Sequence, residues 1–295
     1  MKIIAVIGAG TMGNGIAHVF AQHHYKVHLI DTNEKALAKA LETIEINLDR
    51  MVVKESITTD LKWQTLQSIH TFTDLESGVI PADLVVEAIV ENVEIKLDLF
   101  KKLGEICKPQ TILASNTSSI SITKLASAVP CPNRVIGMHF MNPVPLMTLV
   151  EVVKAFQTDA ETLETINAIT LRIDKIPVES NDFPGFIANR ILMPMINEAI
   201  ETLQNGVAGV IEIDGVMKLG MAHPMGPLQL ADFIGLDVCL SILNVLYDGF
   251  KNPKYAPNPL LVNMVQAGKL GVKSGEGFYD YSMSRKAEVV SSRFV

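Results

Sequence analysis

The sequence predicts an α/β protein in which a doubly wound, mostly parallel sheet is followed by an all-helical C-terminal domain. Three observations predict this fold class. Short β-branched runs alternate with helical periodicity through the first half of the chain, a glycine-rich turn follows the first run, and the strand pattern stops near residue 184. Such alternation is typical of βαβ units, whose crossover helices cover both faces of a parallel sheet.

The predicted strands are short and rich in Ile, Val and Leu. They are residues 3–7, 26–30, 84–89, 111–115, 134–139 and 148–153. Between the second and third of them, "EKALAKALETIEINLDRMVVKE" has the periodicity of one long helix, and a second helix is expected after it. This is more chain than one crossover needs, so we expect a helical insertion near residues 33–67 that projects from the sheet.

A domain boundary is expected near Pro184. Beyond it, "FIANRILMPMINEAIETL", "VIEIDGVMKLG" and "LADFIGLDVCLSILNVLY" have helical periodicity and are separated by Gly and Pro. The predicted organisation is therefore an α/β domain over residues 1–184, a helical domain over 185–282 and a tail over 283–295. The tail carries little periodicity and is expected to fray.

The composition indicates a folded protein of 295 residues, 48% hydrophobic and 19% charged, with a formal net charge of −7. Its 25 basic residues are scattered, so it lacks the basic patch of a nucleic-acid-binding protein. The 3 cysteines have no CxxC spacing and no close His, and neither a disulfide framework nor a metal site is expected. No run approaches the roughly 20 apolar residues of a membrane span. We expect a soluble cytoplasmic protein, although an organellar one without its targeting peptide would have the same pattern.

The stretch "VIGAGTMGNG" places glycines in GxGxxG spacing directly after a strand and at the start of a helix. Gly8 permits a tight turn, Gly10 lets a pyrophosphate approach the backbone, and Gly13 lets helix and strand pack closely. The start of the helix offers free N–H donors. GxGxxG alone is often only a glycine-rich turn, but this context indicates a Rossmann-type dinucleotide site that includes Thr11 and Met12.

Asp31 ends the second predicted strand, at the position where a carboxylate accepts both ribose hydroxyls of an adenosine. A helix N-cap is a second role for Asp31 and is compatible with the first. An anion here repels a 2′-phosphate, and no Arg lies between Leu29 and Ala36 to hold one. NAD is therefore favoured over NADP as the cofactor.

Three polar residues, His139, Asn142 and Glu151, interrupt the apolar stretch "RVIGMHFMNPVPLMTLVEVV". His139 closes one predicted strand and Glu151 lies on the next, so neighbouring strands can bring the two side chains within hydrogen-bond reach. The carboxylate would fix the imidazole tautomer and stabilise imidazolium, leaving the other ring nitrogen to take a proton. A structural core pair is the alternative. A dinucleotide site on the same sheet favours catalysis, because alcohol oxidation needs a base beside a hydride acceptor.

The segments "IGAGTMG", "ASNTSSISIT", "GMHFMNPVPLM", "LVEVV", "PGFIANRI", "AHPMGPLQLADFIGLDV" and "KSGEGFYDY" together resemble the 3-hydroxyacyl-CoA dehydrogenase family, especially its bacterial 3-hydroxybutyryl-CoA branch. The resemblance runs from about residue 1 to residue 282. It implies NAD-dependent, reversible oxidation of (3S)-3-hydroxyacyl-CoA to 3-oxoacyl-CoA in fatty-acid and butanoate metabolism. It also implies that the helical domain contributes to the substrate site and forms a homodimer.

The same resemblance implies roles for individual residues. The catalytic base falls on His139 and its carboxylate partner on Glu151, while Ser118 and Asn189 would contact the substrate, so that the site closes between the two domains. Residues implied to contact the cofactor are Glu91, Lys96, Asn116, Ser118, Asn142 and Lys273. Without the family, Ser118 is equally explained as a turn or helix cap, and Lys96 and Lys273 as solvated surface charges.

The inserted helix carries Arg50 and Lys54, four residues apart and hence on one face. The family holds the phosphates of coenzyme A in this region, so the resemblance implies that these cations bind the acyl-CoA. A solvated helix face is the simpler explanation of both residues.

Two other functions stay open from the sequence. One is a sugar-acid dehydrogenase of the gulonate dehydrogenase and lambda-crystallin type, which shares the two-domain plan. The other is a dinucleotide-binding protein without turnover, although the intact set of Ser118, His139, Glu151 and Asn189 argues against it.

Overall fold

The computed structural model describes all residues from 1 to 295, and the chain divides into two compact units, Met1–Phe186 and Ile187–Val295. The division lies close to Pro184, where the sequence predicts a boundary.

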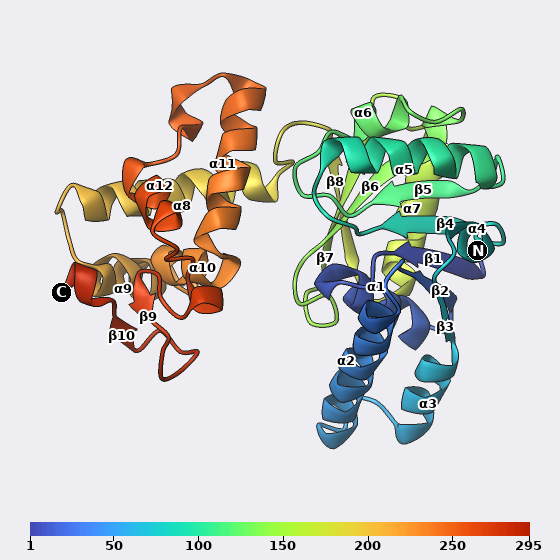
Figure 1. The fold of residues 1–295 in the computed structure, drawn as a ribbon, viewed down its shortest axis with the longest axis horizontal. Helices are drawn as coiled ribbons and strands as arrows, with labels where there is room; N and C mark the ends of the chain where they lie inside the picture. The colour runs from blue at the N-terminus through green and yellow to red at the C-terminus, as the bar shows by residue number, and fades with distance from the viewer. The chain divides into compact units, whose positions relative to one another are not determined.

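The first unit is built on an 8-stranded sheet with the order β3-β2-β1-β4-β5-β6-β7-β8 (Figure 1). Every neighbouring pair is parallel except β6 and β7, which are antiparallel. This confirms the predicted Rossmann-type, mostly parallel sheet. The strands are β1 (Ile3–Ile7), β2 (Lys26–Ile30), β3 (Ile69–Phe72), β4 (Leu84–Glu87), β5 (Ile112–Ser115), β6 (Val135–Phe140), β7 (Leu149–Lys154) and β8 (Ile176–Asn181).

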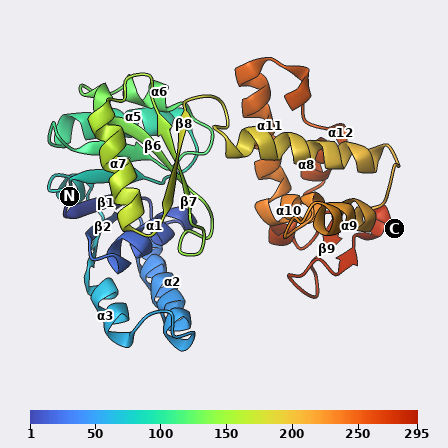
Figure 2. The same ribbon diagram turned by 180° about the vertical axis from the view of Figure 1, so that it is seen from behind.

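Helices cover both faces of this sheet (Figures 1 and 2). On one face, α1 (Thr11–Gln22), α2 (Glu34–Val53) and α7 (Ala160–Arg172) contribute side chains to one buried apolar cluster. On the other, α4 (Leu75–Val79), α5 (Val93–Ile106) and α6 (Ile122–Ala126) contribute to a second cluster. Successive residues of a strand point to opposite faces, so Ala5 and Val6 of β1 belong to different clusters. This two-sided burial explains the nearly continuous apolar runs of the central strands.

The two strands at the edges of the sheet were not predicted. β3 contains "IHTF", of which His70 and Thr71 are exposed, and β8 contains "IPVESN", in which most residues are exposed or half-buried. An edge strand has fewer neighbours to bury it, so its sequence lacks the apolar run that identifies a central strand.

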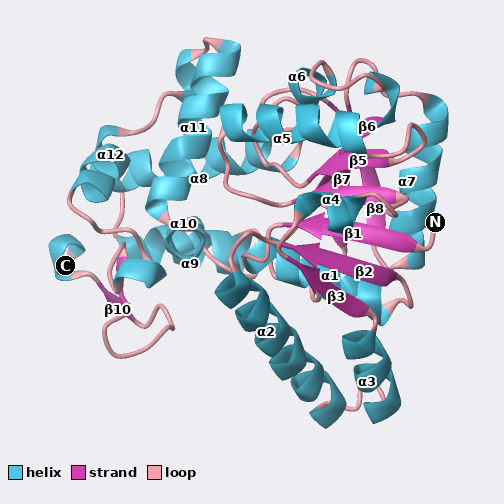
Figure 3. Cartoon of the chain, turned by 45° about the vertical axis from the view of Figure 1, so that its right-hand side comes forward, coloured by secondary structure: helices cyan, strands magenta, loops and turns pink.

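The segment predicted as a helical insertion consists of α2 followed by α3 (Thr59–Gln67), and Figure 3 shows the two helices extending as a pair beyond the edge of the sheet. Each helix begins at a side-chain cap, since Asn33 accepts from the Lys35 N–H and Thr58 accepts from the Leu61 N–H. A stripe of buried residues along α2 packs this helix on the α/β unit: Leu37, Ala40, Ile44 and Leu48.

The second unit contains α8 (Ala188–Gln204), α9 (Val210–Gly220), α10 (Pro227–Ile234), α11 (Leu236–Phe250) and α12 (Pro259–Gln266) around one apolar core. It also contains a short antiparallel hairpin of β9 (Tyr279–Asp280) and β10 (Val289–Val290), too short for any period in the sequence to identify. No single helix is long and apolar enough to cross a membrane; only α10 and α11 together, bent by 96°, reach that length and composition.

The last residues are part of the second unit and make contacts with the rest of it. The Ser291 N–H donates to the Phe278 carbonyl at 3.0 Å, and the Ser291 hydroxyl donates to the Glu276 carboxylate at 2.8 Å. Phe294, in the final turn, packs against Phe278 with ring centroids 5.6 Å apart. These are contacts between residues distant in sequence, which local periodicity does not reveal.

Candidate functional site

The glycine loop between β1 and α1 has the geometry of a phosphate cradle. Gly8 has φ +101°, and a Cβ built there would lie 2.6 Å from the Ala88 carbonyl oxygen. A Cβ on Gly13 would lie 1.7 Å from the Gly8 oxygen, so neither position admits a side chain. A Cβ on Gly10 would meet nothing within 4 Å, which means that the space above this residue is open to a ligand.

The start of α1 supplies donors to that open space. Gly10 is the N-cap of this helix and provides no side-chain cap, while Asn14 turns back to donate to the Gly10 carbonyl at 2.8 Å. The N–H groups of the first turn, which includes Thr11 and Met12, point out of the N-terminus together with the positive end of the helix dipole. This arrangement suits a pyrophosphate.

Asp31 joins the end of β2 to the glycine loop. Its Oδ2 accepts from the Ala9 N–H at 2.8 Å, and its Oδ1 accepts from the Asn33 N–H at 2.9 Å. Each carboxylate oxygen keeps a further lone pair, so both can still accept from hydroxyl groups of a ribose. The loop, the helix start and this carboxylate together fit a dinucleotide.

A buried ion pair lies at the carboxyl ends of β4 and β5. Glu87 and Lys96 are 0% and 1% exposed, and the Lys96 ammonium lies 2.5 Å from Glu87 and 3.2 Å from Glu91. Glu87 also accepts from the Ser115 hydroxyl at 2.6 Å and the Ile89 N–H at 2.8 Å. The explanation of Lys96 as a solvated surface charge is therefore wrong.

Glu91 anchors the serine loop that follows β5. One of its oxygens accepts from the Thr117 hydroxyl at 2.5 Å, the Ser119 hydroxyl at 2.9 Å and the Ser118 N–H at 3.1 Å. Burial by itself would raise the pKa of Glu91, but the Lys96 ammonium and these hydrogen bonds outweigh it and lower the pKa below its ordinary value. Glu91 is thus held as a carboxylate beside Ser118.

Asn116 connects this loop to β6. Its side-chain oxygen accepts from the Phe140 N–H at 2.9 Å, and its own N–H donates to the Glu87 carbonyl at 2.8 Å. The residue before Phe140 is His139, so Asn116 holds the end of the strand that carries the imidazole.

His139 and Glu151 face each other across the antiparallel pair of strands. They are register partners on β6 and β7, and the His139 Nδ1 lies 2.7 Å from the Glu151 Oε2. The two residues are 8% and 1% exposed. A carboxylate oxygen can only accept, so Nδ1 carries the proton, and in the neutral ring Nε2 is the basic nitrogen.

Phe186 packs edge-on against this imidazole, with ring centroids 5.9 Å apart. It follows Gly185, and both residues have positive φ, 74° and 50°. A left-handed conformation is uncommon for a bulky aromatic residue, and its strain is offset here by packing against the imidazole.

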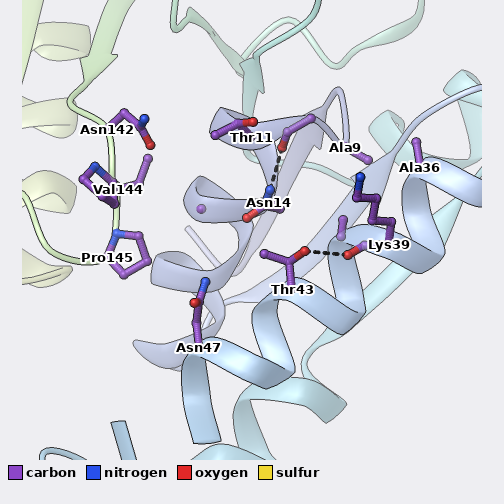
Figure 4. A pocket seen from close by; sticks show the side chains of 14 residues that line it. Ala9, Thr11, Asn14, Ala36, Lys39, Thr43, Asn47, Asn142, Val144 and Pro145 are labelled. Atoms are coloured by element: carbon purple, nitrogen blue, oxygen red, sulfur yellow. Dashed lines mark hydrogen bonds between the residues drawn. The ribbon is translucent and has the colours of Figure 1, made fainter. Parts of the chain in front are cut away.

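A cavity of about 420 Å³ lies between α1, α2 and the loop after β6 (Figure 4). The glycine loop and Asn14 form one wall, and Lys39, Thr43 and Asn47 of α2 form another. The third wall is Asn142, Pro143, Val144 and Pro145. Arg50 and Lys54 do not line this cavity. They are exposed and extend the face of α2 that begins with Lys39, Thr43 and Asn47, since successive members are three or four residues apart.

Two predicted site residues belong to the second unit. Asn189 lies in the first turn of α8. Lys273 is half-exposed and forms an ion pair with Asp237 at the start of α11.

Sequence reasoning missed Glu87 and Phe186. The signal for Glu87 is present, because it interrupts the apolar run "LVVEAI" as His139 interrupts its own strand. The signal for Phe186 is weaker: a large aromatic residue directly after Pro-Gly, where the turn sets the direction of its side chain.

Comparisons with known proteins cover nearly the whole chain. Residues 3–183 match the family described as 3-hydroxyacyl-CoA dehydrogenase, NAD binding domain, and residues 185–281 match its C-terminal domain. A probable 3-hydroxybutyryl-CoA dehydrogenase of Deinococcus radiodurans is 56% identical over 276 residues, covering 94% of this chain and 99% of that protein. The mitochondrial hydroxyacyl-coenzyme A dehydrogenase of Sus scrofa is 45% identical over 288 residues, covering 95% and 91%.

Solved structures agree with these relatives. The crystal structure of (S)-3-hydroxybutyryl-CoA dehydrogenase from Ralstonia eutropha superposes with a TM-score of 0.92 at 44% identity, covering 95% of this chain and 99% of that one. The likeness therefore extends over both units.

Proposed function

The chain belongs to the 3-hydroxyacyl-CoA dehydrogenase family and is an NAD-dependent enzyme, and from this premise we propose that it interconverts (3S)-3-hydroxybutyryl-CoA and acetoacetyl-CoA. The preference for a four-carbon acyl chain is supported by relatives at 48–56% identity that are named for this substrate.

The proposal rests above all on the pairing of His139 with Glu151. Nε2 of His139 takes the proton from the substrate hydroxyl, and the Glu151 carboxylate, bound to Nδ1 at 2.7 Å, stabilises the imidazolium that results. NAD, when bound, supplies the acceptor for the hydride that leaves the third carbon of the acyl chain. In the reverse direction the imidazolium returns its proton to the carbonyl oxygen.

Ser118 and Asn189 position the substrate oxygens. Ser118 is suited to this role because Glu91 fixes its backbone N–H at the carboxyl edge of the sheet, where ligands bind in open α/β folds. Asn189, at the start of α8, offers an amide that donates to the thioester oxygen as charge shifts in the transition state.

The cofactor is held by the glycine loop, by Asp31 at the adenosine ribose, and by residues after β4, β5 and β6. Those residues are Glu91, Lys96, Asn116, Ser118 and Asn142, with Lys273 from the second unit. Asn116 and Lys96 act mainly through others, because Asn116 supports β6 and Lys96 is buried behind Glu91.

Coenzyme A lies along α2. The cavity lined by Thr43 and Asn47 offers neutral hydrogen-bonding groups, and Arg50 and Lys54 continue the same helix face with positive charge. On a chain of net charge −7, two such cations favour the phosphates of an acyl-CoA.

We propose that the protein is a cytoplasmic homodimer associated through its helical unit. The most apolar helix of this unit, α11, is not a suitable contact, because its Leu236, Cys239 and Leu243 are buried in the core of its own unit. The exposed apolar residues of α9 are better placed: Leu219, Ile211 and Val216 are 89%, 61% and 61% exposed.

Steady-state rates test the proposed function. The first assay measures NADH oxidation with acetoacetyl-CoA and with 3-oxoacyl-CoA esters of increasing length. The second assay measures the oxidation of free L-gulonate by NAD on the same protein. The highest kcat/KM is expected for acetoacetyl-CoA. Turnover of gulonate without turnover of any acyl-CoA would place the chain with the sugar-acid dehydrogenases.

A further inference from the structure

Lys175 is a buried ammonium that the proposed chemistry does not use. It lies between α7 and β8, is 6% exposed, and its Nζ donates to the carbonyl oxygens of Val144 and Met147 at 2.8 and 2.7 Å. Both acceptors belong to the loop that joins β6 to β7, which also carries Asn142. Its hydrogen-bond partners are thus backbone carbonyls of one loop.

The surroundings of Lys175 make its charge costly. Burial lowers the pKa of Lys175, and the neighbouring Asp174 carboxylate offsets this effect only in part. The Asp174 carboxylate is exposed and lies 3.1 Å from His23. His18 of α1 also lies near, and burial lowers its pKa to about 4, so it adds no second positive charge. An apolar side chain of the same length would avoid the cost of burying an ammonium.

Lys175 supplies hydrogen-bond donors to two carbonyl groups of this loop. Within the loop, the Pro143 carbonyl accepts from the N–H groups of Leu146 and Met147, both at 3.0 Å, which closes a tight turn. The Val144 and Met147 carbonyls are left to the lysine, whose several N–H donors can serve two acceptors at once.

On its other side the loop rests against α1. A Cβ built on Gly15 would lie 2.8 Å from the Val144 Cβ, so helix and loop are in the closest contact that a glycine allows. Asn142 to Pro145 form one wall of the cavity described above, opposite residues of the glycine loop and α2 (Figure 4). The loop is therefore clamped between Gly15 and Lys175.

We propose that Lys175 is a positioning residue that holds the 141–148 loop, and with it Asn142, in the conformation that binds the cofactor. The inference rests on the proposed function of Asn142 as a cofactor contact. The hydrogen bonds of Lys175 go to the loop carbonyls of Val144 and Met147, so its loss weakens cofactor binding while the proton transfer step remains intact.

The test substitutes Lys175→Met, which preserves length and removes the donors. Amide hydrogen exchange should become at least about tenfold faster in the 141–148 loop and stay unchanged in β1 and β4. The dissociation constant for NADH, measured by its fluorescence, should rise at least about tenfold, and kcat at saturating NADH should fall less than about threefold. Lys154→Met, at the end of neighbouring β7 with only a 3.9 Å contact to Glu179, is the matched control and should change neither quantity.

A folded Lys175→Met protein with wild-type loop exchange and wild-type NADH affinity overturns the proposal. If that variant does not fold, Lys175→Arg keeps N–H donors at the same place. Retained loop protection in the Arg variant supports the clamp, and lost protection in a folded Arg variant contradicts it. Exchange of the loop does not depend on the substrate. Failure of the proposed function would appear instead as absence of turnover in the unsubstituted enzyme.

Discussion

His139 and Glu151 are direct cross-strand partners, joined by a 2.7 Å hydrogen bond between Nδ1 and Oε2. They belong to the one antiparallel pair in an otherwise parallel sheet. The reversal at β7 brings a carboxylate on one strand directly opposite the imidazole on the other, with only a short loop between the strands. The same loop carries Asn142 and accepts two hydrogen bonds from Lys175, so the proposed cofactor contact and the proposed base belong to one local structure.

Asp31 should exclude NADPH. Its carboxylate would repel the 2′-phosphate, and no Arg lies between Leu29 and Ala36 to hold that group, which predicts a kcat/KM roughly 10- to 100-fold lower with NADPH than with NADH. Asp31→Ser should narrow this ratio by raising efficiency with NADPH. Initial rates with both cofactors at fixed acetoacetyl-CoA provide the measurement, and equal efficiencies in the unsubstituted enzyme would contradict this role of Asp31.

Variants of the Glu87–Lys96 ion pair should distinguish its effect on folding stability from its effect on NADH binding. Glu87→Gln leaves the Lys96 ammonium in a buried place with one carboxylate fewer, and we expect a loss of about 3 kcal/mol in unfolding free energy. The double variant with Lys96→Met removes that charge and should recover most of the lost stability, whereas its NADH affinity should fall because Glu91 has lost its cation. Urea unfolding and NADH fluorescence measure the two effects.

Lys101→Met, on the exposed face of the same helix, is the control for that pair. A double variant that regains stability and binds NADH as tightly as the unsubstituted enzyme would mean that the ion pair only stabilises the fold.

His18 should make the protein sensitive to acid. It is 0% exposed, its Nδ1 has no partner, and burial lowers its pKa from 6.5 to about 4. Between these values the unfolded chain binds a proton at His18 and the folded chain does not, so stability falls as the pH falls through this window. The loss is about 3 kcal/mol from pH 7 to pH 4.

His18→Gln should flatten that part of the profile, because an amide does not titrate. The quantity to compare is the difference in unfolding free energy between the two proteins at each pH, which removes the contribution of the carboxylates. Parallel profiles from pH 7 to pH 4 would show that His18 is not the group responsible.

The local sequence pattern was enough to predict those parts of the site that lie within one short segment of the chain. The spacing of Gly8, Gly10 and Gly13 after β1, and the position of Asp31 at the end of β2, follow from residues close in sequence. The pairing of His139 with Glu151 could be predicted because the two residues lie on consecutive strands, which are neighbours in the sheet. The fold class follows from the same alternation of strand and helix.

What the sequence did not predict depends on partners that are remote in the chain. The sequence favours Lys96 as a surface charge, because its partner Glu87 comes from a different element, β4. The two carbonyl acceptors of Lys175 likewise lie 31 and 28 positions earlier in the chain. The edge strand β3 has too few buried residues for its pattern to be recognised. The apolar surface of α11 packs within its own unit, which the periodicity of one helix cannot distinguish from a subunit contact.

The most direct test of the central claim compares His139→Gln with the unsubstituted enzyme in three quantities: turnover of acetoacetyl-CoA, NADH affinity and melting temperature. The glutamine amide occupies similar space and can still hydrogen-bond Glu151, so folding and NADH binding should be nearly unchanged. Turnover should fall roughly 10²–10⁴-fold, the usual effect of losing a general base. A variant that melts much earlier yet keeps its activity per folded molecule would contradict the account, and His139 with Glu151 would then be a structural pair.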